Sequence, residues 1–276
     1  MNAELNEEVY TEQPEAYKNS GKENDVWKLN KSLYGLKQAP RAWYDRLDKY
    51  LCQQGFKRCN TNNNIYFKTK ENGLLITVVY VDDIIFGCNN DKLSHEFADA
   101  MASEFEMSMI GELSFFLGLQ ISQTSEGIFI SQSKYIREML SIFVMADCAP
   151  VGTPMPTSCK LSRDDQSPQV DTALFRSMIG SLLYLTASRP DIMQAVGMVA
   201  RFQACPKESH VIAVKRIFRY LKGTSKFGLW YPKNQKLELL AYTNANWAGS
   251  LDDRKSTSGN AFFLGKCLVA WYIAAI

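Results

Sequence analysis

A long apolar run, Leu74–Val81, limits the folds open to this chain, because two adjacent aspartates interrupt it before it resumes at residues 84–86 and ends at Gly87. Short apolar runs bounded by turn signals favour buried strands, so the sequence predicts a hairpin with Asp82 and Asp83 at its tip. Two neighbouring carboxylates between apolar strands are costly unless they reach solvent or a cation. The pair is therefore either a polar turn or a set of oxygen ligands for a hard divalent ion.

The composition is that of a protein with a substantial core. The chain has 276 residues, 46% of them hydrophobic, which suffices for a core without disulfides or metals as staples. Seven cysteines without a C-x-x-C pair, and two histidines, exclude a zinc-type cluster and favour reduced thiols. Residues 1–17 carry five glutamates and no apolar run, and Leu74–Val81 is too short to span a bilayer. We expect an intracellular protein, cytoplasmic and/or nuclear, that is neither secreted nor bound to a membrane.

Charge is segregated along the chain although the formal net charge is only +2. Residues 27–58 hold eight bases against two acids, and residues 201–233 hold eight bases against one acid. The first of these basic segments also contains Trp27, Tyr34, Trp43 and Tyr44. Aromatic faces beside cations suit stacked bases and phosphates, whereas aromatics in the core with lysines on a solvated helix face give the same pattern.

The expected elements alternate between helices and strands. Pro40 suits the first turn of a helix, and Gly55 closes the apolar spacing that follows it. Prolines 150, 154, 156 and 168 indicate a loop or linker. Further helices are predicted over residues 92–107, 133–143, 175–183, 190–202 and 211–221, and short strands over 113–132 and from 237 to the end.

Several blocks in a fixed order carry a resemblance to a known family. They include Leu33-Tyr34-Gly35-Leu36-Lys37-Gln38-Ala39-Pro40-Arg41, Tyr80-Val81-Asp82-Asp83, Phe116-Leu117-Gly118-Leu119, Tyr184-Leu185-Thr186-Ala187-Ser188-Arg189-Pro190-Asp191 and Tyr220-Leu221-Lys222-Gly223-Thr224. The chain resembles, over nearly its whole length, the reverse transcriptase region of the Pol polyprotein of copia-type long-terminal-repeat retrotransposons. Tyr-Val-Asp-Asp alone is moderately specific, but the blocks in this order and spacing are very specific.

The resemblance implies an α+β fold of the right-hand polymerase type, with an antiparallel palm sheet backed by helices. It implies a partial palm over residues 1–147, a linker over 148–170, a helical thumb-like or connection-like region over 171–235 and a truncated ribonuclease H-like start over 236–276. The implied function is template-directed nucleotidyl transfer by an RNA-directed DNA polymerase. Its implied partners are an RNA template, a DNA primer and deoxynucleoside triphosphates; the sequence indicates no oligomeric state.

The resemblance also assigns roles to residues. It makes Asp82 and Asp83 catalytic ligands of Mg²⁺ or Mn²⁺, and it places Tyr34, Gly35, Lys37, Gln38 and Arg41 in a nucleotide- and template-binding block. Contacts to the nucleic-acid backbone are expected from Arg189, Lys215, Arg216, Arg219 and Lys222, since bases on the polar side of an apolar helix suit phosphate contact. A solvated helix face is the alternative for each of them.

Two departures from the family pattern bear on activity. The strand that would carry a further metal-binding aspartate would precede Asn2, and it and the fingers are absent from the sequence, so Asp82 and Asp83 alone leave the metal site incomplete. Asn244 and Asn246 stand where the ribonuclease H pattern has aspartates, and an amide lacks the charge that competes for a divalent ion.

The end of the chain also leaves the family pattern, at residues 272–276, which suggests a frameshift or premature stop. A sheet left there without covering helices predicts an exposed apolar edge and poor solubility.

These observations favour a fragment of a reverse transcriptase that is inactive as an isolated chain. A non-catalytic nucleic-acid-binding remnant and a decayed pseudogene product are the alternatives.

Overall fold

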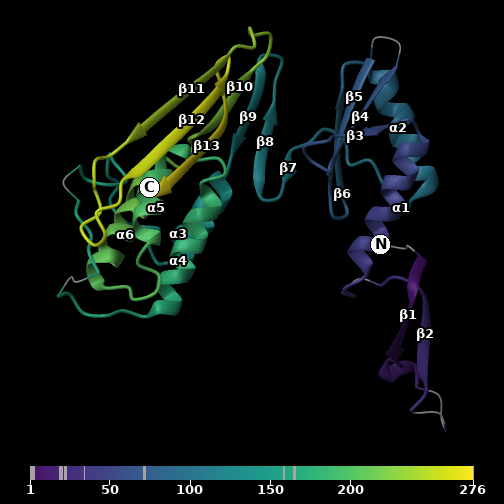
Figure 1. Cartoon of the computed structure of the whole chain (residues 1–276), viewed down its shortest axis with the longest axis horizontal. Helices are drawn as coiled ribbons and strands as arrows, with labels where there is room; N and C mark the ends of the chain where they lie inside the picture. The colour runs from purple at the N-terminus through teal and green to yellow at the C-terminus, as the bar shows by residue number, and fades with distance from the viewer. Residues whose placement is uncertain are drawn as a thin grey trace. The chain divides into compact units, whose positions relative to one another are not determined.

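The computed structural model describes residues 4–18, 21, 24–33, 35–70, 73–157, 159–163 and 166–275. The chain divides into two compact units, Met1–Gly111 and Glu112–Ile276, each built of helices and antiparallel sheets (Figure 1). This mixture of antiparallel sheets and helices confirms the predicted α+β class. Within the described residues, no helix combines the length and the apolar character needed to cross a bilayer.

The first unit has a four-stranded antiparallel sheet with the strand order β3-β4-β5-β6. On β5, buried residues alternate with more exposed ones, so that Leu75 and Val79 face the core while Leu74 and Ile76 remain exposed. The two helices of the unit share that core with the sheet. The elements are α1 (Ala39–Gln53), β3 (Lys57–Arg58), β4 (Ile65–Lys70), β5 (Gly73–Tyr80), β6 (Asp83–Cys88) and α2 (Asp91–Glu104).

The helix predicted between Pro40 and Gly55 and the hairpin predicted around Asp82 and Asp83 are both confirmed. Pro40 lies in the first turn of α1, where a missing N–H costs nothing. Gly55 follows the helix with φ +84°, a left-handed conformation that glycine adopts at low cost.

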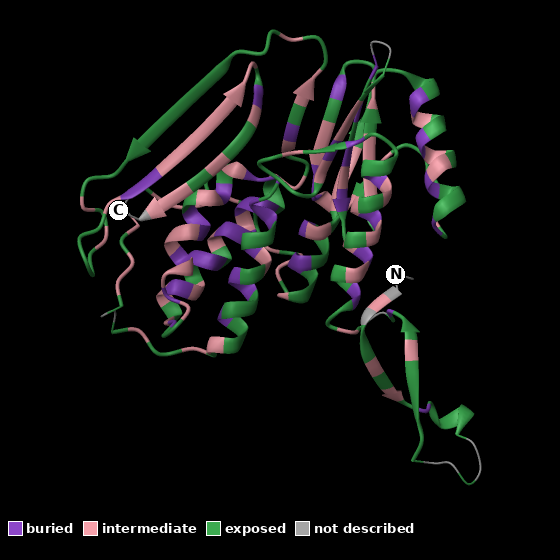
Figure 2. Ribbon diagram, turned by 45° about the vertical axis from the view of Figure 1, so that its right-hand side comes forward, coloured by how far each residue is buried: buried purple, intermediate pink, exposed green. Residues whose placement is uncertain are grey.

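A second hairpin in this unit was not predicted. It pairs β1 (Glu4–Glu12) with β2 (Val26–Lys31), and a short 3-10 turn, η1 (Glu15–Tyr17), lies between them. Most of its residues are exposed (Figure 2). The acid-rich β1 lacks the alternation of apolar and polar residues that signals a half-buried strand.

The second unit packs its helices around one apolar core whose members include the fully buried Ile179, Leu182, Ile217 and Phe218. The predicted helices are all present, with a 3-10 turn leading into α5. They are α3 (Ser133–Ile142), α4 (Thr172–Leu185), η2 (Pro190–Ile192), α5 (Met193–Ala200) and α6 (Glu208–Gly223).

Two antiparallel sheets complete this unit. The first has the order β10-β9-β8-β7, formed by β7 (Phe115–Phe116), β8 (Leu119–Gln123), β9 (Gly127–Ser131) and β10 (Gly228–Pro232). The second is the meander of β11 (Leu239–Ala245), β12 (Thr257–Leu264) and β13 (Cys267–Ala275). Every residue of β11 is exposed, Leu239 at 70% among them, so the expected apolar edge is present.

The proline-containing segment forms a loop, as its composition predicts, but it does not separate the two units. Its described residues contain no helix or strand beyond an isolated bridge between Gln169 and Lys207. The compact units instead divide after Gly111, so residues 112–147, which the resemblance assigns to the partial palm, lie in the second compact unit.

Candidate functional site

The two aspartates lie at the tip of the β5–β6 hairpin. Tyr80 pairs with Asp83, which leaves Val81 and Asp82 as the two central residues of the turn. Both carboxylates are exposed, and Val81 has a positive φ of 55°. The hairpin therefore presents two neighbouring carboxylates to solvent from the end of a strand that is buried on one face, which avoids the cost of burying them.

One side chain of α1 reaches this turn. The indole Nε1–H of Trp43 donates a hydrogen bond to the Val81 carbonyl oxygen at 2.8 Å, although the two residues are 38 positions apart. Trp43 is 7% exposed and meets the Phe105 ring edge to face, with centroids 5.1 Å apart. The turn is thus joined to the aromatic core of the first unit.

A pocket of about 450 Å³ lies beside Asp82. Its described lining includes Lys31, Trp43, Arg46 and the residues 104–108, so both signs of charge face it. Arg46 pairs with Glu104 at 2.9 Å and lies over the Phe105 ring, 5.1 Å from its centroid. The pocket is therefore lined by basic side chains (Lys31, Arg46) and by acidic ones (Glu104, Glu106), next to the exposed carboxylate of Asp82.

The described residues alone do not complete a metal site. Asp82 and Asp83 provide oxygen donors of the kind that Mg²⁺ and Mn²⁺ prefer. Among the described residues, however, no group of three or more His, Cys, Asp or Glu side chains is arranged to hold a metal ion. Two carboxylates from one turn leave the remaining coordination positions without protein ligands.

The expected nucleotide-binding block lies just before α1. Tyr34 falls outside the described residues. Gly35 has φ +96°, with open space where a Cβ would stand, and Lys37, Gln38 and Arg41 are exposed. Their side chains are presented to solvent at the start of α1, but none of these four is among the described residues that line the pocket beside Asp82.

Three of the predicted phosphate-binding bases on α6 hold a segment of the chain itself. The Lys222 ammonium donates to the Ala146 carbonyl at 2.6 Å, and the Arg219 Nε donates to the Ala149 carbonyl at 2.8 Å. Arg216 donates to the Thr153 hydroxyl at 2.9 Å. Lys215 is exposed on the same helix. These contacts hold residues 146–153 against α6, so the three basic side chains stabilise the fold of this unit.

Arg189 is buried, 1% exposed, rather than presented to a ligand. Its guanidinium binds both carboxylate oxygens of Asp191, at 2.8 and 2.6 Å, and donates to the Thr224 carbonyl and hydroxyl at 2.9 and 2.7 Å. Burial raises the pKa of Asp191, but the hydrogen bonds and charge of Arg189, with a hydrogen bond from Tyr220, outweigh it and hold that pKa below its usual value. A guanidinium so engaged is unavailable to a phosphate.

The two asparagines have different surroundings. Asn244 is exposed on β11 and lines a pocket of about 460 Å³ with residues of β12 and β13. The Asn246 side-chain oxygen accepts a hydrogen bond from the Thr257 N–H at 2.6 Å, and its own N–H donates to the Thr257 carbonyl at 3.1 Å. Asn246 therefore closes the end of the β11–β12 ladder.

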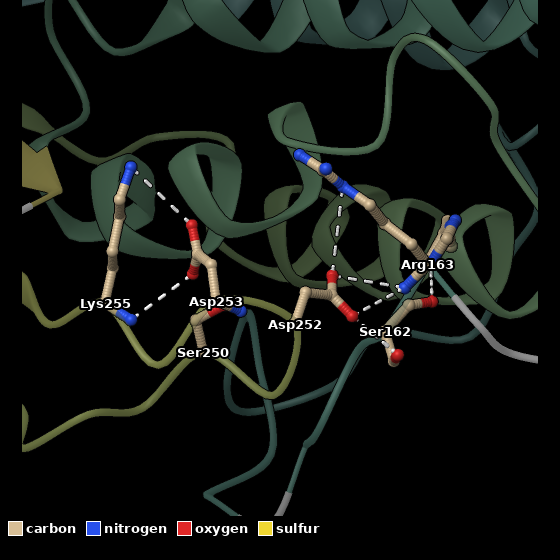
Figure 3. A network of polar contacts seen from close by, with 7 residues as sticks. Ser162, Arg163, Ser250, Asp252, Asp253 and Lys255 are labelled. Carbon is tan, nitrogen blue, oxygen red and sulfur yellow. Dashed lines mark hydrogen bonds and ion pairs between the residues drawn. The ribbon is translucent and has the colours of Figure 1, made fainter.

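A polar network that no sequence motif indicates joins two loops of the second unit (Figure 3). Asp252 accepts hydrogen bonds from the Ser162 hydroxyl at 2.7 Å and from the Arg163 N–H at 3.0 Å. Beside it, a hydrogen bond with Ser250 lowers the pKa of Asp253, which also pairs with Lys255 at 3.7 Å. The contacts of Asp252 could not be predicted from a local motif, because its partners Ser162 and Arg163 lie 90 and 89 positions away.

Comparison with known proteins places this chain in a family. A family model described as reverse transcriptase (RNA-dependent DNA polymerase) matches residues 1–157. The retrovirus-related Pol polyprotein from transposon RE1 of Arabidopsis thaliana is 39% identical over 97% of this chain and 18% of the relative. The corresponding polyprotein from transposon TNT 1-94 of Nicotiana tabacum is 37% identical over 98% of this chain and 21% of the relative.

A shorter relative is matched along most of its length. The putative transposon Ty5-1 protein of Saccharomyces cerevisiae is 30% identical over 98% of this chain and 89% of the relative. By contrast, the chain spans about a fifth of the length of the plant polyproteins. The chain belongs to the reverse transcriptase (RNA-dependent DNA polymerase) family, in the form found in the Pol polyproteins of copia-type retrotransposons.

Proposed function

We propose that Asp82 and Asp83 are the carboxylate pair of a polymerase active site that adds deoxynucleotides to a primer on an RNA template. The observation that carries this proposal is their exposure together at the tip of an antiparallel hairpin, inside the region that the reverse transcriptase model matches. The pocket beside Asp82, with Lys31 and Arg46 in its wall, supports the assignment because phosphates need cations.

In this reaction the primer 3′-hydroxyl attacks the α-phosphorus of the nucleotide and pyrophosphate leaves. Reverse transcriptases generally use divalent metals, for which Asp82 and Asp83 are the donors in this chain. Because the described residues do not complete that site, we infer that the 276-residue chain does not extend primers by itself. The family pattern places the remaining carboxylate on a strand before Asn2.

The units receive corresponding roles in this proposal. The sheet and helices of the first unit act as a partial palm, the helices of the second unit act as a thumb-like region, and β11–β13 are the start of a ribonuclease H-like sheet without nuclease activity. Lys37, Arg41 and Lys215 are the exposed bases that we assign to nucleic-acid contact. Arg189 is left out because its donors are engaged in the core.

Primer extension on an RNA template tests the proposal. The 276-residue chain is compared with a chimera. In the chimera, the segment that precedes the matched region of the tobacco polyprotein is joined to the N-terminus of the 276-residue chain. We expect extension by the chimera alone, and a loss of at least about 100-fold with Asp82→Asn or Asp83→Asn, since these carboxylates would hold the metal ions that stabilise the attacking and leaving oxygens. Asp99→Asn, an exposed carboxylate of the same unit, is the matched control.

Two outcomes would contradict the proposal. Extension that survives both Asp82→Asn and Asp83→Asn would remove these residues from the active site. A chimera that folds and binds duplex in a salt-dependent manner but never extends a primer would favour the non-catalytic nucleic-acid-binding alternative.

A further inference from the structure

The turn that carries the aspartates holds an unfavourable backbone conformation. Val81, the first central residue of the two-residue turn, has φ 55°. Positive φ at such a position is usually supplied by Gly, Asn or Asp, and for a β-branched residue it is a clear outlier. The surroundings must therefore hold the turn in place, since a strained conformation persists only where neighbouring structure determines it.

The Trp43 indole makes a hydrogen bond to the backbone of this turn. Its N–H can only donate, and it meets the Val81 carbonyl at 2.8 Å, directly before the peptide nitrogen of Asp82. The Val81 side chain is 51% exposed, so burial of that side chain does little to fix the turn. The indole hydrogen bond is a fixed point on the backbone between the strained residue and the first aspartate.

The indole is itself firmly placed. Trp43 is 7% exposed on α1 and packs edge to face against Phe105, which packs in the same way against Tyr50 at 5.2 Å. The Tyr50 hydroxyl donates to the Ala100 carbonyl of α2 at 2.8 Å. Both helices of the first unit thus fix the ring that binds the turn, so a displacement of the indole would have to disturb the core.

We propose that Trp43 is a positioning residue that sets where Asp82 and Asp83 point, by holding the strained turn through its indole N–H. This role rests on the proposed function of the aspartate pair, and in it Trp43 acts through the backbone of the turn. A purely structural role, in which the ring only fills the core, predicts that the N–H is dispensable.

The decisive variants keep the ring and remove the donor. Trp43→Phe retains an aromatic ring, and incorporation of 3-benzothienylalanine at position 43 retains the indole shape with sulfur in place of the N–H. Trp271 is a matched control, because its indole N–H also donates to a backbone carbonyl, that of Thr186 at 2.9 Å, in the second unit. Trp271→Phe removes the same kind of bond in the other unit.

Hydrogen exchange measured on the 276-residue chain gives the first readout and needs no activity. We expect the peptide covering residues 79–86 to exchange about fivefold faster in both position-43 variants, which matches the loss of one net hydrogen bond. Trp271→Phe should leave that peptide unchanged. Unchanged exchange in the benzothienylalanine variant would overturn the proposal, because that variant preserves the packing even where Trp43→Phe does not fold.

Steady-state kinetics of the chimera gives the second readout. Misplacement of the carboxylates predicts a kcat lower by roughly 10- to 100-fold, with the KM for nucleotide within about threefold of the parent. A benzothienylalanine variant with parental kcat would overturn the positioning role. If Asp82→Asn leaves extension intact, the proposed function fails instead, and the exchange result still reports whether Trp43 holds the turn.

Discussion

Replacing Asp191 by Asn removes the counter-charge of a buried guanidinium. In the second unit, Arg189 is 1% exposed and binds both oxygens of Asp191, while the Tyr220 hydroxyl donates to one of them at 2.9 Å. Asparagine keeps one oxygen and turns its NH₂ group toward the Arg189 donors. The variant therefore loses one acceptor and leaves a positive charge buried without its partner.

The cost follows from this geometry. Removing one partner of a fully buried ion pair destabilises a protein by about 3–5 kcal/mol. The Asp191 side chain is 32% exposed, so water replaces part of the lost interaction and screens the rest. We expect Asp191→Asn to lower the free energy of unfolding by about 2–3 kcal/mol at neutral pH.

The pH dependence has a definite sign. Although burial raises the pKa of Asp191, its partners hold that pKa below the usual aspartate value, so its contribution is complete above about pH 4. The contribution is lost as the pH falls through the lower pKa of the folded state. The difference between the parent and Asp191→Asn should therefore shrink in acid.

Urea unfolding followed by far-ultraviolet circular dichroism, from pH 7 down to about pH 2.5, measures both effects. Hydrogen exchange of the α4 and α6 amides assigns the loss to the second unit. Glu238→Gln is the control, because Glu238 and Lys236 form an exposed pair at 3.9 Å whose loss should not move the midpoint. An Asp191→Asn midpoint equal to that of the parent, or a difference that is unchanged in acid, would show that the Asp191 carboxylate does not stabilise the buried Arg189 guanidinium.

Three further predictions concern the same unit. Phe218→Ala should cost about 3–5 kcal/mol of unfolding free energy, because Phe218 is 0% exposed; a urea-measured loss below about 1 kcal/mol would contradict the described core. His210→Ala removes an Nδ1 acceptor for the Lys207 N–H and an Nε2 contact to the Ser162 carbonyl. Amides of the first turn of α6 should therefore exchange faster with solvent, and unchanged exchange would argue that His210 does not cap this helix. Lys222→Met should speed thermolysin cleavage within residues 146–153 whereas Lys215→Met should not, and equal rates would show that the Ala146 contact does not hold the segment.

Residues that mark the ends of helices and strands made much of the fold predictable. The bounds of α1 follow from Pro40 and Gly55, and the β5–β6 hairpin follows from apolar runs on either side of two aspartates. The β1–β2 hairpin could not be predicted in this way, because its strands are polar and are specified by pairing across residues 13–25. Strand pairing of that kind depends on distant residues rather than on local pattern.

The same distinction between local pattern and distant contacts applies to the candidate site. The exposure of Asp82 and Asp83 at a turn could be predicted from their neighbours. The hydrogen bond from Trp43 to Val81 could not, because it joins residues 38 positions apart through the packing of α1 on the sheet. Likewise, the spacing of bases on α6 indicates a polar face, but only the tertiary structure reveals that Lys222 meets the Ala146 carbonyl rather than solvent.

Manganese binding to the chimera, followed by electron paramagnetic resonance, tests most directly whether the aspartate turn is a catalytic metal site. We expect Asp82→Asn combined with Asp83→Asn to abolish the tightest Mn²⁺ site, and Asp99→Asn to leave it intact. Undiminished Mn²⁺ affinity in the doubly substituted chimera would show that these two aspartates do not form the metal site.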